Sequence, residues 1–503
     1  MDTNFYDVVV CGGELTGLIA AALLGRRGFR VLLLGHDADR PSFEAAGTVL
    51  SREPALLPPL DATPLARVLK ELNCIQVVKR RAPALAPGFQ VALPRHRFDV
   101  PASDEALRRE LDREFKADRP AIEGALGRLA ATSALLDPLL ATEMTLPPDG
   151  FWERREMGRI ESLLPRPGAD LLDPLPANHP IRAAVAMPAA LSAALAPNDV
   201  GTVGQARAFS LARRGLHRLE GGSAALHALF LEKLQTFAGE RRDKLTPVEI
   251  VVRRGRAVGI KVRPREETIG CQHLVWAGPA ATMQRFTGER PARKGRDAGP
   301  GLHLAAYRYG LSLLVTPEAL PEGMAQRVFL VADPGRPLLE DNALVVTIGQ
   351  PGQRDPGRLP VWVECLVPAA PVDAGPGYLR AVRARVVARL RQLLPFFERH
   401  LVVMASPYDG LPPEVPGRAG APPLPAVPPL PLPPVYSTEG PRSFDVAGLQ
   451  HATGVKNLYL ASRENLPGLG FEGELVSAWG VARLITGTQP KRDILRREVL
   501  ISE

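Results

Sequence analysis

Residues 6–34 read YDVVVCGGELTGLIAAALLGRRGFRVLLL and contain the clearest structural signal in the chain. The β-branched run at 6–11 predicts a strand that ends at a glycine turn. Small and aliphatic residues at 18–24 predict a helix, which ends before two arginines and Gly28. Residues 30–34 form a second apolar strand. Strand, glycine turn, helix and strand predict a βαβ unit, and continuously apolar strands predict a parallel sheet covered on both faces.

Length and composition limit the possible classes of protein. A chain of 503 residues is too long for one ordinary core, so two or three domains are expected. Its 45% hydrophobic and 23% charged residues fit a soluble globular protein, and the net charge of +8 is dispersed. The absence of a CxxC/HxxxH pair and of an RNP-like aromatic run argues against a nucleic-acid partner and a metal.

The sequence predicts a cytoplasmic location. The chain enters a strand almost at once, leaving no room for a signal peptide, and it has no apolar run long enough to span a bilayer. At most a peripheral attraction to anionic lipid surfaces is expected. The four cysteines have no metal-ligand spacing and are expected to be small core residues in a reducing compartment; they are Cys11, Cys74, Cys271 and Cys365.

The remaining chain changes character along its length. Residues 60–210 are rich in Ala, Leu, Arg and Pro and predict a largely helical insertion. Residues 420–435 are proline-rich and predict polyproline II, either as a surface loop or as a docking segment. Other helices are expected at 106–115, 122–140, 224–237, 378–394 and 475–486, and strands at 248–253, 257–262, 273–277 and 457–461.

Three glycine-containing motifs occur in a defined order. The first is VCGGELTG at 10–17, and the second is RLEGGSAAL at 218–226, with RGRAVG at 254–259 and VWAGP at 275–279. The third is NLYLA at 457–461, followed by PGLGFEG at 467–473. The set resembles the phytoene desaturase-like and amine oxidase-type proteins of the FAD-dependent oxidoreductase superfamily. The resemblance covers the cofactor domain, about half of the chain.

The resemblance implies an α/β fold with two discontinuous domains. A Rossmann-like FAD-binding domain with a parallel sheet would comprise residues 1–60, 215–300 and 440–490. An α+β substrate domain with the helical insertion would comprise 61–214 and 301–439, and a charged tail would follow at 491–503.

The resemblance also implies the cofactor-binding residues. The first turn and helix would receive the FAD diphosphate, the strand at Val248 would pass the adenine, and the last glycine turn would lie beside the flavin ring. The full set is Gly12, Gly13, Glu14, Gly17, Gly35, Asp37, Val248, Gly278, Arg463, Gly468, Gly470 and Gly473.

Several of these positions depart from the family pattern. The middle glycine of G-x-G-x-x-G is Glu14, where the backbone should come closest to the pyrophosphate. Like charges about 4 Å apart repel by roughly 4 kcal/mol at an effective dielectric near 20, which weakens binding about a thousandfold. Alternatively, Glu14 occupies the anion site itself, since an acid near a helix N-terminus is stabilising.

Other departures fall around the same ligand. The second strand ends in Gly35 where an acid should accept the ribose hydroxyls, and Asp37 is the nearest substitute. Residues 40–44 lack a glycine pair, and the last turn begins at Ser462 rather than at glycine. Leu469 and Glu472 would add bulk and charge near the flavin, whereas Arg463 would pair with the diphosphate. FAD therefore remains a doubtful cofactor.

No catalytic residue can be assigned from the sequence. His217, His227 and His273 have no partner visible in sequence and are expected to be surface or core histidines. Trp276 and Trp479 lie in apolar contexts and are expected to pack. The lack of a Ser/His/Asp arrangement fits a family in which the cofactor carries the chemistry.

Two functional hypotheses remain. In the first, the chain is a pseudoenzyme, a binding or scaffold protein for a lipophilic small molecule or for a protein partner that contacts the proline-rich loop or the tail. Rab GDP-dissociation inhibitors and escort proteins are precedents in the superfamily. In the second, it is an active FAD-dependent desaturase or dehydrogenase that removes hydride from a lipophilic, isoprenoid-like substrate.

Overall fold

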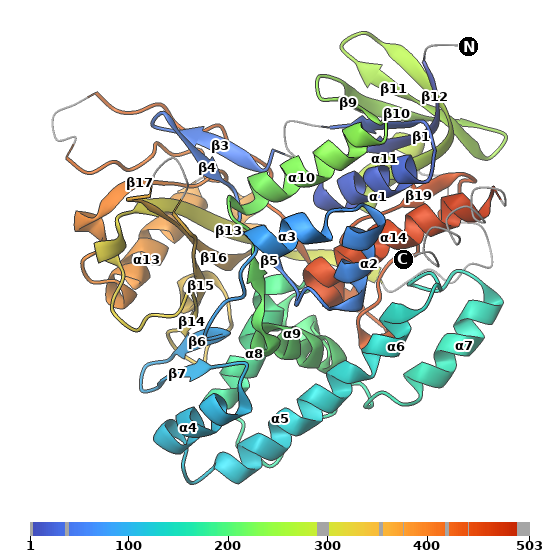
Figure 1. Cartoon of the computed structure of the whole chain (residues 1–503). Helices are drawn as coiled ribbons and strands as arrows, with labels where there is room; N and C mark the ends of the chain where they lie inside the picture. Colours follow the sequence, from blue (N-terminus) through green and yellow to red (C-terminus); the bar gives the residue numbers. More distant parts are fainter. Residues whose placement is uncertain are drawn as a thin grey trace.

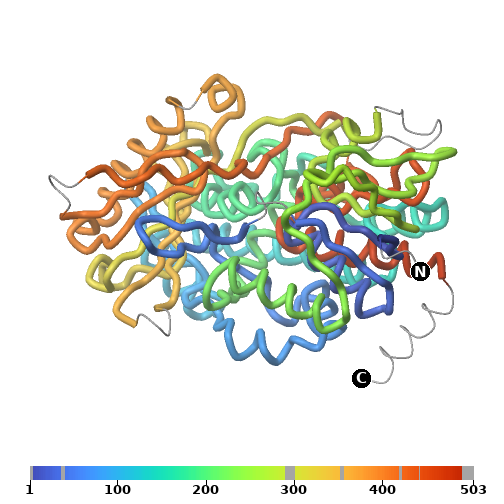
Figure 2. The backbone as a smooth tube through the Cα atoms, turned by 90° about the horizontal axis from the view of Figure 1, so that it is seen from above, coloured from blue at the N-terminus to red at the C-terminus, as the bar shows by residue number. Residues whose placement is uncertain are grey.

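Two sheets form the two halves of the molecule in the computed structural model (Figure 1). The structure describes residues 4–35, 40–288, 301–351, 356–375, 377–417, 422–440 and 442–489. Viewed from above, segments from the start, middle and end of the chain gather in one half, so the halves are discontinuous in sequence (Figure 2).

The first sheet contains the predicted βαβ unit. β1 (Phe5–Cys11) pairs in parallel with β2 (Val31–Leu34), and α1 (Leu15–Arg26) connects them. β1 also pairs in parallel with β12 (Glu267–Trp276). Residues 16–25 of α1 are all buried, because this small-residue helix lies between the sheet and two other helices.

The first sheet is completed by more distant segments. Its strand order is β10-β11-β12-β1-β2-β9, and β19 also pairs with β12. The predicted hairpin is confirmed, and two other helices pack on α1. The bounds are β9 (Glu240–Arg242), β10 (Thr246–Arg253), β11 (Arg256–Arg263), β19 (Leu458–Leu460), α10 (Gly222–Thr236) and α14 (Gly470–Gly487).

The second sheet is mainly antiparallel. Its order is β17-β13-β16-β15-β14-β6-β7, with β18 on β13, and α13 (Gly377–Leu393) packs on it through buried Val and Leu side chains. The strands are β6 (Phe89–Ala92), β7 (Arg97–Val100), β13 (Gly301–Val315), β14 (Arg327–Val331), β15 (Ala343–Ile348), β16 (Leu359–Pro368), β17 (Leu401–Ala405) and β18 (Pro434–Glu439).

The insertion is mostly helical, but β6 and β7 correct that prediction, because β6 joins the second sheet through parallel pairing with β14. The expected helix 122–140 is interrupted near Leu135. The helices are α2 (Thr63–Glu71), α3 (Ile75–Arg81), α4 (Asp104–Glu114), α5 (Arg119–Ala134), α6 (Leu136–Ala141), α7 (Phe151–Glu161), α8 (Pro180–Ser192) and α9 (Thr202–Gly215).

Short elements join the halves. A hairpin of β3 (Ser42–Ala45) and β4 (Thr48–Ser51) follows the first βαβ unit, β5 (Leu56–Leu57) pairs with β8 (His217–Arg218), and α11 (Ala280–Thr287) follows β12. All four cysteines are buried, as expected. None of the helices in the described ranges has the length and apolar composition needed to cross a bilayer. The charged tail at 491–503 lies outside the described residues.

Candidate functional site

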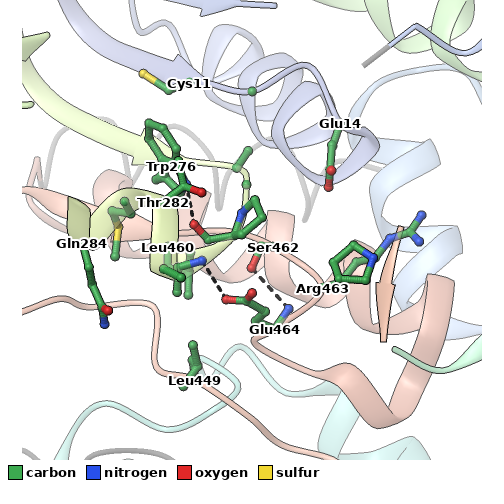
Figure 3. A pocket seen from close by; sticks show the side chains of 18 of the residues that line it. Cys11, Glu14, Trp276, Thr282, Gln284, Leu449, Leu460, Ser462, Arg463 and Glu464 are labelled. Carbon is green, nitrogen blue, oxygen red and sulfur yellow. Dashed lines mark hydrogen bonds between the residues drawn. The ribbon is translucent and has the colours of Figure 1, made fainter. Parts of the chain in front are cut away.

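A cavity of about 1190 Å³ lies where the two halves meet. Its walls come from the β1–α1 turn, the β12–α11 connection, the start of β13, the proline-rich segment and residues 449–464 (Figure 3). This volume is slightly above the range of about 300–1,000 Å³ that is usual for small-molecule sites. The cavity can therefore hold an extended ligand.

The glycines of the first turn are explained by close packing. Gly12 has φ +112°, and a Cβ there would lie 2.7 Å from the carbonyl oxygen of Ala277. A Cβ on Gly17 would lie 2.5 Å from the Cβ of Ala277. Gly13 is buried between them. The turn thus keeps the tight approach of helix to strand that dinucleotide-binding folds use.

Glu14 caps α1 at the cavity wall. Its backbone has φ −57° and ψ 158°, and its side chain makes no hydrogen bond to the first turn of the helix. The side chain is exposed into the cavity and lies at the same end as Arg463 (Figure 3). Glu474 contributes most to raising the pKa of Arg463, and Glu14 adds to the effect. Glu14 therefore acts as a fixed negative charge at the helix N-terminus.

Arg463 is held by a second carboxylate. Its Nε lies 2.8 Å from Oε1 of Glu474, and Thr16 donates a hydrogen bond of 3.2 Å to Oε2 of the same residue. Burial raises the pKa of Glu474, and Arg463 opposes that shift. The sequence predicted that Arg463 would pair with a diphosphate, but in the structure a protein carboxylate pairs with it.

A neighbouring pair has the same character. Arg52 donates a hydrogen bond of 2.8 Å to the hydroxyl of Tyr408, and its Nε lies 3.6 Å from Oε1 of Glu53. Burial works against the charge of Glu53, but Arg52 and Arg463 lower its pKa below the usual value. The polar end of the cavity thus contains arginines that already have carboxylate partners.

A carboxylate from another part of the chain lies beside Gly35, the position where the resemblance expects an acid. A Cβ on Gly35 would lie 2.4 Å from Oδ1 of Asp243, which is 2.5 Å from Nε of Arg241. Asp243, just after β9, therefore places a carboxylate beside Gly35, but it pairs with Arg241 and neither Gly35 nor Asp243 lines the cavity. The predicted substitute, Asp37, lies outside the described residues. Sequence reasoning missed Asp243 because it lies far along the chain.

Val248 occupies an irregular position in β10. The pairing with β11 passes from Pro247 to Glu249, which leaves Val248 in a β-bulge. A bulged residue is withdrawn from the regular ladder, so its backbone groups are available to a ligand. Thr246 and Pro247 line the cavity beside it.

The last glycine turn serves local packing. A Cβ would lie 2.9 Å from Cα of Val446 at Gly468, and 2.5 Å from the carbonyl oxygen of Leu466 at Gly473. Gly470 has φ +54° and is equally crowded. Among the described residues, the cavity wall here comes from 449–464 rather than from these glycines. Their role in cofactor binding stays a prediction.

Glu472 does not reach the cavity. Both of its carboxylate oxygens lie 2.7 Å from guanidinium nitrogens of Arg207, and the glutamate is only 1% exposed. Asp137 also pairs with Arg207 at 2.7 Å. The expectation that Glu472 would add charge near a flavin is therefore wrong, because its carboxylate binds Arg207 of α9 and points toward the helices instead of the cavity.

A second helix, α11, also begins at the cavity, and a carboxylate of the protein accepts a hydrogen bond from its first amide. The amide of Ala280, which begins α11, donates a hydrogen bond of 2.9 Å to Oε2 of Glu464 (Figure 3). The hydroxyl of Tyr436 donates one of 2.5 Å to Oε1. Burial raises the pKa of Glu464. Gly278, one of the predicted cofactor residues, lines the wall just before this helix.

Of the two tryptophans that the sequence predicted to be packing residues, one also lines the cavity. Trp276 is 6% exposed and packs edge-on against Phe286 with ring centroids 5.4 Å apart, yet it also lines the cavity. Trp479 is 3% exposed and lies outside the wall. His227 lines the cavity, and burial lowers its pKa to about 4, so the imidazole is neutral at pH 7.

The other two histidines do not line the cavity. His217 contacts the carbonyl oxygen of Ala82 at 2.8 Å through Nδ1, and His273 is buried. Within the described parts of the chain, no group of three or more His, Cys, Asp or Glu residues could hold a metal ion.

Part of the cavity wall is apolar. Part of it is formed by the proline-rich segment, whose backbone is held by a hydrogen bond of 2.7 Å from Leu430 to Pro407 and one of 2.9 Å from Arg308 to Pro433. This part of the segment is an ordered wall. The apolar lining includes Met283, Phe286, Leu302, Leu304, Tyr307, Leu432 and Leu449.

Comparison with solved structures identifies the fold. The chain is similar to an oxidoreductase from Methanosarcina mazei (15% identity, 94% of this chain and 99% of that chain, TM-score 0.57). It is also similar to cyclohexylamine oxidase from Brevibacterium oxydans (11%, 95% and 98%, TM-score 0.56) and to a putrescine oxidase variant with redesigned cofactor binding (13%, 96% and 99%, TM-score 0.54). These likenesses show the fold: the chain has the fold of these oxidoreductases and amine oxidases.

The other comparisons gave no relatives. No protein-family model matches the sequence, and no curated protein matches it. The expected mixed α/β fold class is confirmed by the structural likeness.

Proposed function

We propose that this chain is a non-catalytic binding protein that keeps the flavoenzyme fold and takes a lipophilic ligand in its cavity. The observation that carries the proposal is the carboxylate of Glu14 at the N-terminus of α1. This helix end is where a dinucleotide-binding fold receives the pyrophosphate.

The polar end does not fit the FAD diphosphate. The partial positive charge of α1 already faces Glu14, and Arg463 already pairs with Glu474 at 2.8 Å. A diphosphate would have to compete with these carboxylates for the same positive groups. Repulsion from one like charge at about 4 Å is roughly 4 kcal/mol at an effective dielectric near 20.

The apolar part of the cavity wall fits a lipophilic ligand. Leucine, phenylalanine, methionine and proline side chains line the cavity between α11, β13 and the proline-rich segment. Burial of apolar ligand surface contributes roughly 25 cal/mol per Å² removed from water. A long hydrocarbon or isoprenoid ligand would gain most from this wall.

The first experiment combines spectroscopy with ligand extraction. The absorption spectrum is recorded before and after incubation with excess FAD and desalting, and bound lipid is identified by mass spectrometry of an organic extract. The proposal predicts no flavin bands and a bound apolar molecule. Flavin at one equivalent per chain would overturn it.

A pair of variants tests the apolar wall. Leu304 lines the cavity and is 43% exposed, whereas Val77 on α3 is 41% exposed and lies outside the lining. Leu304→Arg should weaken uptake of a fluorescent fatty-acid probe at least tenfold, and Val77→Arg should leave it unchanged. Equal effects of the two changes would contradict the assignment.

A second candidate function is supported by the adenosine end. Asp243 lies beside Gly35, where it would have to leave Arg241 to accept ribose hydroxyls, and Val248 lies in a bulge next to the cavity-lining Thr246 and Pro247. These features favour an FAD-dependent oxidoreductase acting on a lipophilic substrate, which flavin bands in the first experiment would support. Binding of a protein partner by the proline-rich segment or by the tail stays a prediction.

A further inference from the structure

Helix α7 presents large apolar side chains to solvent. Phe151 is 66% exposed and Trp152 is 73% exposed, and Leu163, just after the helix, is 66% exposed. The two aromatic rings pack edge to face with centroids 5.5 Å apart. Phe151 and Trp152 contact each other, and adjacent exposed side chains of this size mark an interaction surface rather than ordinary surface scatter.

Arginines share this face of the helix. At 3.6 residues per turn, Arg155 and Arg159 fall on the side of Phe151 and Trp152. The Arg155 guanidinium lies 5.9 Å from the Trp152 ring centroid. We call Phe151, Trp152, Arg155, Arg159 and Leu163 the α7 patch.

The opposite face of α7 is anchored to the protein. Met157 is 1% exposed, and Ile160 packs against the same apolar cluster. The acid Glu153 is directed inward, where it lies 3.0 Å from Arg483 of α14. The acid near the patch is Glu156, whose carboxylate lies 3.6 Å from Arg159. The outward face therefore carries two aromatic side chains and two arginines, and Arg159 has Glu156 as a partner.

We infer that the α7 patch docks the protein on the surface of an anionic lipid membrane. Trp and Phe suit the headgroup layer because an apolar ring and a polar edge can both be satisfied there, and arginines beside them contact lipid phosphate. The net charge of +8 adds long-range attraction to such a surface.

The location of the patch links docking to the cavity. Arg154, next to the patch in the same helix, lines the cavity, as does Asp149 just before the helix. A ligand leaving the bilayer at α7 would meet the cavity wall directly. This last step rests on the proposed function, whereas docking itself does not.

Vesicle co-sedimentation tests the docking. The full chain is mixed with phosphatidylcholine vesicles that either contain or lack phosphatidylglycerol. We expect binding to the anionic vesicles that weakens with salt. Arg155→Gln with Arg159→Gln should weaken binding by roughly 25-fold, about fivefold for each arginine. Phe151→Ser with Trp152→Ser should weaken it roughly tenfold or more.

A matched control exists in the other half of the molecule. Phe396 is 62% exposed, and the guanidinium of Arg399 lies 5.5 Å from its ring centroid. Phe396 follows α13 in the chain, and Figure 1 shows α13 and α7 on opposite sides of the molecule. Phe396→Ser with Arg399→Gln should bind vesicles as the wild type does.

Tryptophan fluorescence reports the contact directly. The chain has four tryptophans, and Trp276, Trp362 and Trp479 are 6%, 4% and 3% exposed. Trp276 lines the cavity, so quenching by brominated lipid is measured in the Leu304→Arg background, where the cavity should not take up lipid. The quenching should then come from Trp152, and Trp152→Phe should remove it while retaining most of the binding.

Two results would overturn the docking proposal. One is the absence of vesicle binding, which would direct the search to a protein partner; the other is binding that the patch variants leave unchanged. Leu304→Arg should keep vesicle binding while losing the fatty-acid probe, so failure of docking and failure of the proposed function are distinguishable.

Discussion

Replacing Glu14 with glycine restores the family pattern at the one position where the backbone meets a pyrophosphate. The substitution removes a carboxylate that makes no side-chain capping bond. Glycine is acceptable as an N-cap, so the start of α1 should survive. The expected result is that Glu14→Gly binds FAD more tightly than the wild type does.

The size of the gain depends on how far water screens the charge. One like charge about 4 Å from a phosphate costs roughly 1 kcal/mol in bulk water and roughly 4 kcal/mol at an effective dielectric near 20. Glu14 is exposed at the cavity wall, and a bound ligand would exclude water from its surroundings. The gain should therefore lie between about fivefold and about a thousandfold. Loss of the favourable interaction with the helix end should lower the free energy of unfolding by about 0.3–1 kcal/mol.

The assay is FAD titration followed by flavin fluorescence, with Kd compared among variants. Glu14→Gln separates charge from bulk, because it keeps the size and removes the charge. Glu105→Gln is the control, since Glu105 also lies in the first turn of a helix, α4, but not at the cavity. The reasoning is refuted if the wild type already binds FAD tightly, or if neither variant at position 14 binds better.

Three further predictions concern stability. Burial lowers the pKa of His227 from 6.5 to about 4, so the unfolded chain binds a proton that the folded chain does not as pH falls through that window. The free energy of unfolding should then drop by up to about 1.4 kcal/mol per pH unit, and His227→Gln should flatten the slope in urea titrations between pH 6.5 and 4. Arg207→Ala leaves the carboxylate of Glu472, which is 1% exposed, without its arginine partner. It should lower the free energy of unfolding in urea by about 3–5 kcal/mol. A decrease under 1 kcal/mol would show that water reaches the pair. Gly17→Ala should lower the free energy of unfolding, measured by thermal unfolding, by about 1–3 kcal/mol. Gly127 on α5 faces open space, so Gly127→Ala should raise the free energy of unfolding by about 0.4–1 kcal/mol. Equal changes in the two variants would contradict the packing explanation.

Local patterns in the sequence predicted the first sheet well. The strand, turn and helix at β1 and α1 depend on neighbours in the chain, so periodicity and glycine placement were enough. The strands β6 and β7 were missed, since β6 depends on pairing with β14, far away in sequence. Strand formation of this kind reflects packing context more than intrinsic preference.

The residues of the candidate site also fall into those that a local sequence pattern could predict and those that it could not. The sequence alone placed Gly12, Glu14 and Gly17 in one turn, because they are consecutive members of a local motif. Asp243, which fills the space beside Gly35, could not be assigned to the site from any local pattern.

The sequence by itself determined the βαβ unit, the glycine turn and the presence of a carboxylate in that turn, because these follow from residue type and spacing. The larger fold was expected only through the resemblance of the three motifs to a known family. Only the tertiary structure decided which charges meet: Glu14 and Glu474 act on Arg463, whereas Glu472 is taken by Arg207. The physical reason is that the energy of an ion pair depends on the distance and the dielectric between its charges. The packing of segments far apart in the chain sets both quantities.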